Sequence, residues 1–370
     1  MNQSVDVLLA RARREVDEGL LPAAQIALAR DGEVQLLETY GDATEDSLFC
    51  MFSATKAVTS AAAWLLFQED LLEEATTVAE VIPEFAENGK DAITVGQLFT
   101  HTAGFPYAPF RPLDWVDRNR RLERFAQWRL NWEPGSRFEY HPTSTMWVIA
   151  ELIERVSGKP FTEFVRQRVT EPLGLDNLLV GLESDEDNRR AVEICFVGEA
   201  LTAEDYKAMG MAVPPETEVN EETILRFNDA DVRAVGVPGG GGFAGAADLA
   251  LFYQALLHGG LGGERIWSED MLRSARRIRS GDFKDPYFNR LANRGLGIII
   301  AGDDSRSFRG FGKTNSPETF GHNGAGGQLA WVDPESGLSL AYLTSGHDRN
   351  EIRQARRGVA IGSLAAVAEV

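Results

Sequence analysis

Hydrophobic and polar residues alternate near both ends of the chain in the manner of β-strands. Five segments fit this pattern: 23–30, 34–40, 295–300, 327–332 and 338–344. Asp31-Gly32, between the first two segments, is a pair typical of tight hairpin turns. Because these segments come from both ends of the sequence, we expect one antiparallel sheet to which both ends contribute.

Elsewhere the apolar residues recur every three or four positions, which is the period of an α-helix. The predicted helices are 5–20, 53–72, 94–100, 144–156, 246–258 and 353–368. The pattern predicts an α+β fold, in which an α/β sheet lobe (1–72 with 289–370) carries an inserted, mostly helical lobe (73–288). An acidic stretch within the insertion, 183–228, shows no clear period and is interpreted as an irregular, solvated segment.

Composition and charge exclude several classes of protein. The 370 residues carry a formal net charge of −19, which opposes binding to nucleic acid or to an anionic membrane, so neither is expected as a partner. The first residues lack a basic and apolar leader, and no apolar run reaches the ~18 residues of a membrane span, so we expect a cytoplasmic protein. The two cysteines and five histidines show no metal-ligand spacing, and we expect neither a metal nor a cofactor.

Ser53 and Lys56 stand three positions apart at the start of the predicted helix 53–72. Residues at this spacing share one helix face, with Cβ atoms about 5–6 Å apart, so their side chains can meet. The helix N-terminus favours an oxyanion on Ser53, and its field and partial burial both disfavour a proton on Lys56. A neutral lysine beside a serine is a general base beside a nucleophile. The alternative is a capping serine beside a solvated lysine, because this spacing also arises by chance.

Two further segments are candidates for the same chemistry. Tyr140 precedes the predicted helix 144–156, and a tyrosine held near a lysine can ionise or relay a proton; the alternative is a core aromatic residue. The glycine-rich run 321–327 permits close approach of a ligand, and its backbone N–H groups are candidate oxyanion donors. The alternative for that run is a bulged edge strand.

A tryptophan-rich stretch, 105–134, follows the predicted helix 94–100. Trp115, Trp128 and Trp132 either line a substrate cleft or pack in a core, and both interpretations stay open. The walls of the cleft would decide which substrate is bound.

Ser53-x-x-Lys56, Tyr140-x-Pro142 and His322-Asn323-Gly324, in this order, resemble the motifs of the serine β-lactamase and penicillin-binding-protein superfamily. The closer resemblance is to its class C β-lactamase-related branch, which also contains esterases and DD-peptidases. The segments 93–104, 239–249 and 331–334 are similar to that branch as well, and the resemblance covers nearly the whole chain except 183–228. It implies a β-lactamase/transpeptidase-like fold.

The resemblance also implies a role for each matched residue. Ser53 would be the acylated nucleophile, Lys56 would accept its proton, and Tyr140 would assist as a base and activate the water that deacylates. The backbone N–H groups of Ser53 and Ala325 would form the oxyanion hole. The substrate-binding residues would be Pro142, His322, Asn323 and Gly324.

Two positions depart from the pattern of the β-lactamases, because Pro142 stands where they carry asparagine or serine and Asn323 replaces threonine. His322 stands where many members carry lysine, although the resemblance includes DD-peptidase-like members with histidine there. We therefore predict a serine hydrolase that cleaves small carboxylic esters through an acyl-enzyme. The alternatives are a β-lactamase, amidase or DD-peptidase-like hydrolase, an acyltransferase that uses the same serine, and a non-catalytic binder. The expected partners are a small ester or amide substrate and, in a homo-oligomer, further copies of the chain.

Overall fold

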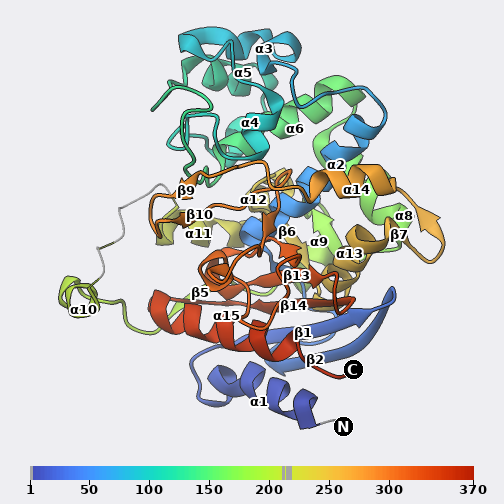
Figure 1. The fold of residues 1–370 in the computed structure, drawn as a ribbon, viewed down its shortest axis with the longest axis vertical. Helices are drawn as coiled ribbons and strands as arrows, with labels where there is room; N and C mark the ends of the chain where they lie inside the picture. Colours follow the sequence, from blue (N-terminus) through green and yellow to red (C-terminus); the bar gives the residue numbers. More distant parts are fainter. Residues whose placement is uncertain (1–2, 211–212, 214–218) are drawn as a thin grey trace.

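The central sheet is antiparallel and is assembled from both ends of the chain (Figure 1). The computed structural model describes residues 3–210, 213 and 219–370. In spatial order the strands are β11 (Ile299–Ile300), β12 (Phe320–Gly321), β13 (Leu329–Asp333), β14 (Leu338–Thr344), β1 (Ala23–Arg30) and β2 (Glu33–Gly41). Strands β1 and β14 pair with Ala24 opposite Thr344. The predicted α+β class, with one sheet from both chain ends, is confirmed.

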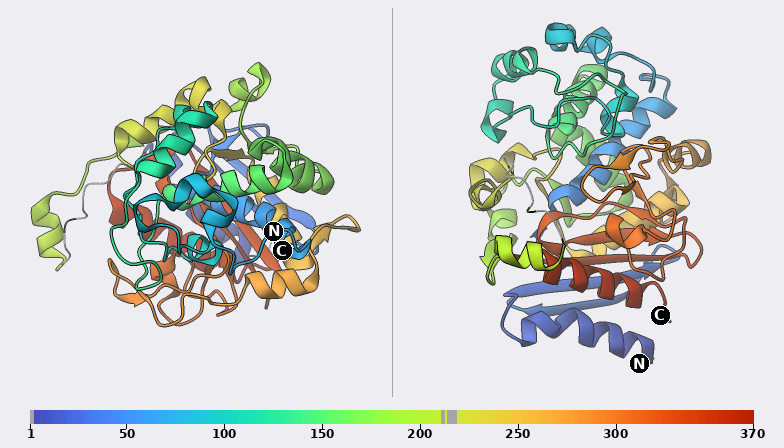
Figure 2. Two further views of the ribbon diagram at one scale, coloured as in Figure 1. Left: turned by 90° about the horizontal axis from the view of Figure 1, so that it is seen from above. Right: turned by 60° about the vertical axis from the view of Figure 1, so that its left-hand side comes forward.

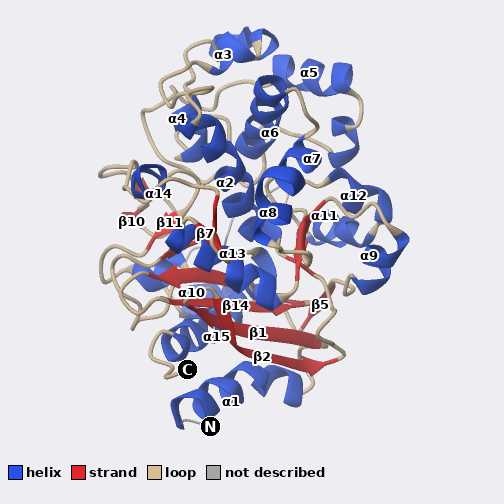
Figure 3. Cartoon of the chain, turned by 90° about the vertical axis from the view of Figure 1, so that its right-hand side faces the viewer, coloured by secondary structure: helices blue, strands red, loops and turns tan. Residues whose placement is uncertain are grey.

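Both faces of this sheet are covered by helices (Figure 3). Alternate residues of β1 enter different cores, because successive side chains of a strand point to opposite faces. Ala24, Ile26 and Leu28 pack with α1 (Gln3–Asp17) and α15 (Glu351–Ala365). Ala23, Ala27 and Ala29 belong to the larger core, to which α13 (Ala246–His258) contributes. The sheet is therefore the middle layer of three.

A helical lobe lies at the far end of the molecule from α1 (Figures 1 and 2). It contains α3 (Val78–Val81), α4 (Val95–Phe99), α5 (Arg118–Gln127), α6 (Ser144–Ser157) and α7 (Phe161–Val165). Helix α2 (Thr55–Gln68) packs against α6 and α7 and also against α14 (Glu269–Ala275). Every residue of α2 from Thr55 to Leu66 is buried, so this helix connects the core around α6 and α7 with the core around α14. The lobe boundaries at residues 72 and 289 stay a prediction.

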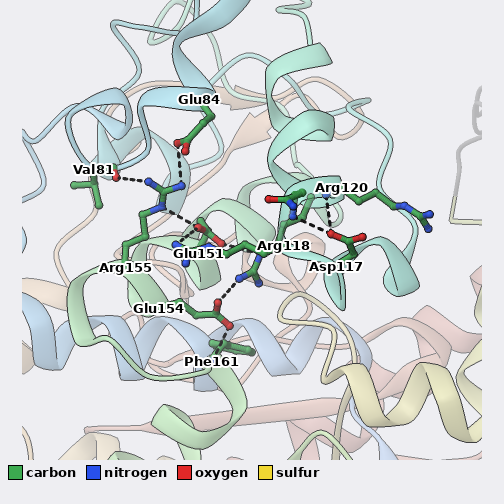
Figure 4. Close-up of polar contacts among 11 residues, drawn as sticks. Val81, Glu84, Asp117, Arg118, Arg120, Glu151, Glu154, Arg155 and Phe161 are labelled. Carbon is green, nitrogen blue, oxygen red and sulfur yellow. Dashed lines mark hydrogen bonds and ion pairs between the residues drawn. The ribbon is translucent and has the colours of Figure 1, made fainter.

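A buried ion network fixes α6 within the helical lobe (Figure 4). The Glu151 carboxylate is fully buried and lies within ion-pair distance of Arg118, Arg121 and Arg155. Arg155 also binds Glu84, with Nη2 2.9 Å from Oε2. Since α6 begins at Ser144, the network anchors the helix that follows Tyr140.

The acidic segment 183–228 is more ordered than the sequence predicted. It forms α9 (Asp185–Arg190), β5 (Cys195–Val197), α10 (Ala203–Ala208) and α11 (Glu221–Leu225), apart from the part that lies outside the described residues. Strand β5 pairs in parallel with β15 (Gly346–Asp348). Ile194 and Ile224 are buried against Phe52 and Phe243, so hydrophobic contacts hold the segment to the body of the protein.

Short elements complete the fold. A three-stranded sheet has the order β3 (Phe49–Cys50), β6 (Gly242–Ala244), β4 (Leu178–Val180). The other α-helices and strands of the described residues are α8 (Glu171–Leu173), α12 (Ala230–Val235), β7 (Gly260–Leu261), β8 (Glu264–Arg265), β9 (Lys284–Asp285) and β10 (Arg290–Leu291).

Several predicted boundaries were wrong, and left-handed backbone explains most of them. The predicted helix 5–20 ends at Asp17, ahead of Gly19 with φ +75°. The predicted helix 53–72 begins as a 3₁₀ turn and ends before Asp70, which has φ +56°. The predicted strand 295–300 is reduced to its last two residues, because Gly297 at φ +74° interrupts it.

Candidate active site

Ser53 lies in a 3₁₀ turn, Phe52–Ala54, that leads directly into α2. Lys56 is fully buried, and its Nζ is 3.1 Å from Ser53 Oγ and 2.7 Å from the carbonyl oxygen of Gly239. Burial lowers the pKa of Lys56, because a charged amine is poorly solvated there. The structure thus brings the two residues of the predicted motif into contact, and a depressed pKa suits the lysine to accept a proton.

The first residue of β6 and the loop before this strand both form hydrogen bonds with α2 near Ser53. Thr55 Oγ1 accepts a hydrogen bond from the Gly242 backbone N–H at 2.9 Å. One turn later, Thr59 Oγ1 donates to the Pro238 carbonyl at 2.7 Å. These contacts lie on both sides of Lys56 and restrict how far its helix can move relative to the loop.

Tyr140 reaches Ser53 from the helical lobe, although the two residues are far apart in the sequence. Its hydroxyl donates to Ser53 Oγ at 2.9 Å. Burial alone would raise the pKa of Tyr140, but the charge of Lys56, hydrogen bonds with Ser53 and Lys56 and the charge of Arg294 together lower it. The Tyr140 hydroxyl therefore lies within hydrogen-bond distance of Ser53 Oγ, and its neighbours favour its deprotonated form.

The residues on either side of Tyr140 are tied to the loop after α4. The Glu139 N–H donates to the His101 carbonyl at 3.2 Å, and the His141 N–H donates to His101 Nδ1 at 3.3 Å. His141 Nε2 accepts from the Phe105 N–H at 3.1 Å, and burial lowers the pKa of this histidine to about 3. A neutral His141 can accept this bond, whereas a protonated one cannot. The His101 ring also contacts the Tyr140 ring, with centroids 4.8 Å apart.

His322 follows β12 and lies with its ring centroid 6.1 Å from that of Tyr140. Its Nδ1–H donates to the Asn323 carbonyl at 2.9 Å, and burial followed by the charges of Lys56 and Arg294 holds its pKa well below the usual value. His322 is therefore a neutral ring with no charge to offer a substrate. The side chain of Asn323 is already engaged, since its amide donates to the Gly310 carbonyl at 2.6 Å.

Gly324 lets the end of this segment approach the Ser53 turn. A Cβ atom at this position would lie 2.1 Å from the Met51 carbonyl oxygen, so no larger residue fits without movement of the backbone. The 3₁₀ turn Ala325–Gly327 follows, and Arg357 from α15 donates a hydrogen bond to the Gly326 carbonyl at 3.4 Å. The predicted oxyanion donors, the N–H groups of Ser53 and Ala325, thus belong to two backbone segments that pass each other closely.

The core interpretation is correct for two of the three tryptophans, and the interpretation of Trp132 as a cleft residue stays a prediction. Trp115 and Trp128 are 8% and 3% exposed and pack in the core of the helical lobe, so for them the core interpretation is correct. Trp132 lies nearer the site, with its ring 5.8 Å from that of His141. Pro142 is half-buried and lies two residues before α6 begins.

Two residues near Tyr140 were not predicted from the sequence. His101 lies in a segment that was identified only as the end of a short helix, although this segment resembled the family. Arg294 lies between β10 and β11, with its guanidinium carbon 5.3 Å from the centroid of the Tyr140 ring. No local pattern singles out this arginine among the 37 lysines and arginines of the chain.

Among the described residues, no three or more histidine, cysteine, aspartate or glutamate side chains are grouped so that they could hold a metal ion. Within the same part of the chain, no helix is both long and apolar enough to cross a membrane.

The chain is similar to several known proteins. The family model described as Beta-lactamase matches residues 9–363. Esterase/beta-lactamase LipL of Mycobacterium tuberculosis (strain ATCC 25618 / H37Rv) is 28% identical over 311 residues, which cover 80% of this chain and 69% of that protein. A putative D-alanyl-D-alanine carboxypeptidase of Escherichia coli (strain K12) is 25% identical over 348 residues, covering 85% and 72%. The crystal structure of a family VIII carboxylesterase matches with a TM-score of 0.77 at 25% identity, covering 97% of this chain and 98% of that one.

The chain belongs to the Beta-lactamase family. The predicted resemblance to the serine β-lactamase and penicillin-binding-protein superfamily is confirmed, and with it the prediction of a serine hydrolase.

Proposed function

We propose that this serine hydrolase cleaves small carboxylic esters through an acyl-enzyme on Ser53. The observation that carries the proposal is the double contact at Ser53 Oγ, which has Lys56 Nζ at 3.1 Å and the Tyr140 hydroxyl at 2.9 Å. A nucleophile within reach of two groups with lowered pKa values can lose its proton as it attacks. The names of LipL and of the family VIII carboxylesterase support an ester substrate.

In the proposed mechanism Ser53 Oγ attacks the ester carbonyl carbon while its proton passes to the Lys56–Tyr140 pair. The carbonyl oxygen takes up the negative charge and receives hydrogen bonds from the N–H groups of Ser53 and Ala325. The C–O bond to the alcohol then breaks, and the alcohol leaves with the proton held by the pair. A water molecule, deprotonated by Tyr140, attacks the acyl-enzyme, and its proton returns to Ser53 as the acid is released.

Hydrolysis of β-lactams or peptide amides is the second candidate, and the name of the carboxypeptidase relative supports it. Two features favour esters. Pro142 has no side-chain group to bind a substrate amide, and the Asn323 amide is already bonded to Gly310. The substrate-binding roles of Pro142, His322, Asn323 and Gly324 are part of this proposal.

One experiment tests the assignment directly. The purified protein is given a short-chain nitrophenyl ester, a chromogenic cephalosporin and a short peptide amide, and kcat/KM is measured for each. We expect the ester to exceed the cephalosporin by at least ~10-fold, equivalent to about 1.4 kcal/mol of transition-state preference. A fluorophosphonate probe is expected to modify Ser53, as mass spectrometry of the labelled peptide would reveal. A cephalosporin that reacts faster than the ester would reassign the enzyme as a β-lactamase.

A cytoplasmic location, a homo-oligomeric state and independence from metals and cofactors also remain predictions. Subcellular fractionation tests the first, and light scattering coupled to size-exclusion chromatography tests the second.

A further inference from the structure

Arg294 is a buried arginine whose side chain has no counter-ion among the residues that the structure describes. It is 9% exposed, and its guanidinium carbon lies 5.3 Å from the Tyr140 ring centroid and 5.4 Å from that of Phe138. Its Nε is buried without a hydrogen-bond partner, and its side chain makes no ion pair or hydrogen bond within the part of the chain that the structure describes. Among the other buried arginines, Arg121 and Arg309 each bind a carboxylate, and Arg233 and Arg357 bind backbone carbonyl oxygens.

The histidines around Tyr140 carry no charge. Burial, followed by nearby cations, holds the pKa values of His101 and His322 well below the usual histidine value. Burial lowers the pKa of His141 to about 3. None of these three rings therefore supplies a positive charge to Tyr140 at neutral pH.

The carboxylates near Tyr140 do not neutralise Arg294 either. Glu139 is paired with Arg137 and also accepts a hydrogen bond from Tyr107. Asp285 acts on Arg294 only at longer range, without an ion pair between the two. The cations that act on the Tyr140 ring are thus Lys56 from α2 and Arg294 from the loop between β10 and β11.

These two cations are not equivalent during the reaction. Lys56 has to be neutral to accept a proton, and a neutral amine no longer stabilises a phenolate on Tyr140. An arginine stays protonated in proteins, so the charge of Arg294 persists when Lys56 is neutral. A fixed cation at this distance favours the phenolate of Tyr140 and disfavours a proton on Lys56, and both effects move the pair toward its base form.

We propose that Arg294 is a positioning residue whose fixed charge holds the Tyr140–Lys56 pair in the deprotonated form that activates Ser53. The proposal rests on the proposed function, in which Tyr140 and Lys56 serve as the base. It adds a charged residue that reaches the site from a segment outside the three motifs.

The test compares Arg294→Met with Arg294→Lys over a range of pH on a neutral nitrophenyl ester. A nearby opposite charge shifts the pKa of an acid by about 1–3 units. Arg294→Met is therefore expected to shift the acidic side of the kcat–pH profile to higher pH by about one unit. At pH values on that side of the profile, kcat should fall approximately tenfold. The activity should return at higher pH, KM should stay unchanged, and Arg294→Lys should restore most of the wild-type profile. Arg276→Met is the matched control, because Arg276 is a partly buried arginine stacked on Phe320 at 4.6 Å.

Two outcomes would overturn the proposal. One is an Arg294→Met profile whose acid limb coincides with that of the wild type. The other is a loss confined to KM for an ester that carries a carboxylate, with a neutral ester unaffected, which would make Arg294 a substrate ligand instead.

A spectroscopic titration separates this inference from the proposed function. The ultraviolet difference spectrum between wild type and Tyr140→Phe follows tyrosinate formation at Tyr140 without any substrate. We expect Arg294→Met to raise the pH at which this signal appears. If the signal shifts but no ester is hydrolysed, the proposed function fails and the role of Arg294 stands. If esters are hydrolysed and the signal does not shift, the role of Arg294 fails alone.

Discussion

Lys56 Nζ lies 2.7 Å from the Gly239 carbonyl oxygen, which joins the helix that follows Ser53 to the loop before β6. A carbonyl oxygen accepts a hydrogen bond from either protonation state of an amine. The contact therefore keeps the nitrogen beside Ser53 Oγ after Lys56 has lost its charge. Burial and alignment act together on this lysine, because burial lowers its pKa while Gly239 fixes its position.

Replacing Ser53 or Lys56 should separate the nucleophile from its base. Ser53→Ala is expected to abolish turnover, and Lys56→Met to reduce kcat by several orders of magnitude while leaving KM nearly unchanged. Steady-state kinetics on a nitrophenyl ester measure both effects. Near-native turnover by Ser53→Ala would refute the proposed mechanism.

Removing the Tyr140 hydroxyl should slow deacylation most strongly. Tyr140→Phe keeps the ring contacts with His101 and His322 but loses the 2.9 Å hydrogen bond to Ser53, so the activating base for water is lost. We expect kcat to fall about 10²–10⁴-fold and an acyl-enzyme to accumulate on Ser53, visible as an added mass. Tyr107→Phe, an exposed tyrosine beside the same segment, serves as the control and should keep its activity.

Pro142→Asn tests the ester preference. An asparagine at this position adds a side-chain donor and acceptor for a substrate amide, and each hydrogen bond contributes about 0.5–1.5 kcal/mol. The ratio of kcat/KM for the nitrophenyl ester to that for the cephalosporin should fall by about 2- to 10-fold, through a faster cephalosporin reaction. A ratio that does not change, or that rises, would argue against Pro142 as the reason for the preference.

Acid should destabilise the protein steeply below about pH 6.5. Burial lowers the pKa of His347 to about 4, although the charges of Glu221 and Asp348 oppose the shift, and burial lowers the pKa of His141 to about 3. The pKa values of His101 and His322 are lowered as well. Below the histidine pKa of the unfolded chain, that chain takes up protons that the folded protein excludes, so stability falls as pH falls. Each such histidine adds up to about 1.4 kcal/mol per pH unit.

Urea unfolding at pH values between 7 and 5 measures this slope. His347→Gln should flatten this slope by the contribution of one histidine. Equal slopes for wild type and His347→Gln would contradict the assignment.

Glu151→Gln should destabilise the helical lobe without changing the rate of the catalysed reaction. Glu151 is fully buried among three arginines, and removing one partner of a buried ion pair typically costs about 3–5 kcal/mol. The free energy of unfolding in urea reports this loss, and kcat per folded molecule should be unchanged. Glu84→Gln, which removes a partly exposed partner of Arg155, should cost less than about 1 kcal/mol.

Local patterns predicted the elements that local forces determine. Helix 246–258 and strand 338–344 were predicted with the boundaries that the structure has. A glycine marks one end of each element, because Gly259 follows the helix and Gly337 precedes the strand. The strand at 295–300 was overestimated, since its apolar residues are buried through packing and not through pairing along their whole length. The segment 183–228 was underestimated for the reverse reason, because its few buried residues find partners far away in the sequence.

The sequence predicted those site residues that belong to recognisable motifs. The spacing of Ser53 and Lys56 implied their contact, and the resemblance linked Tyr140 and His322 to them. Arg294 could not be found from the sequence, because its contact with the Tyr140 ring and its lack of a counter-ion among the described residues both arise from the fold. The contact of Lys56 with Gly239 was likewise not predictable, because the two residues are 183 positions apart in the sequence.

The pairing of β1 with β14 also governs the order in which the chain can fold. Thr344 Oγ1 donates to the Ala23 carbonyl across 321 positions of the sequence. During synthesis β1 and β2 emerge long before β14, which is the strand that pairs with the other side of β1. Ser53 and Lys56 therefore leave the ribosome long before the sheet beneath them can close, and the nascent hairpin has one edge unpaired throughout that interval. We expect this late pairing of β14 with β1 to appear as a slow late step in refolding.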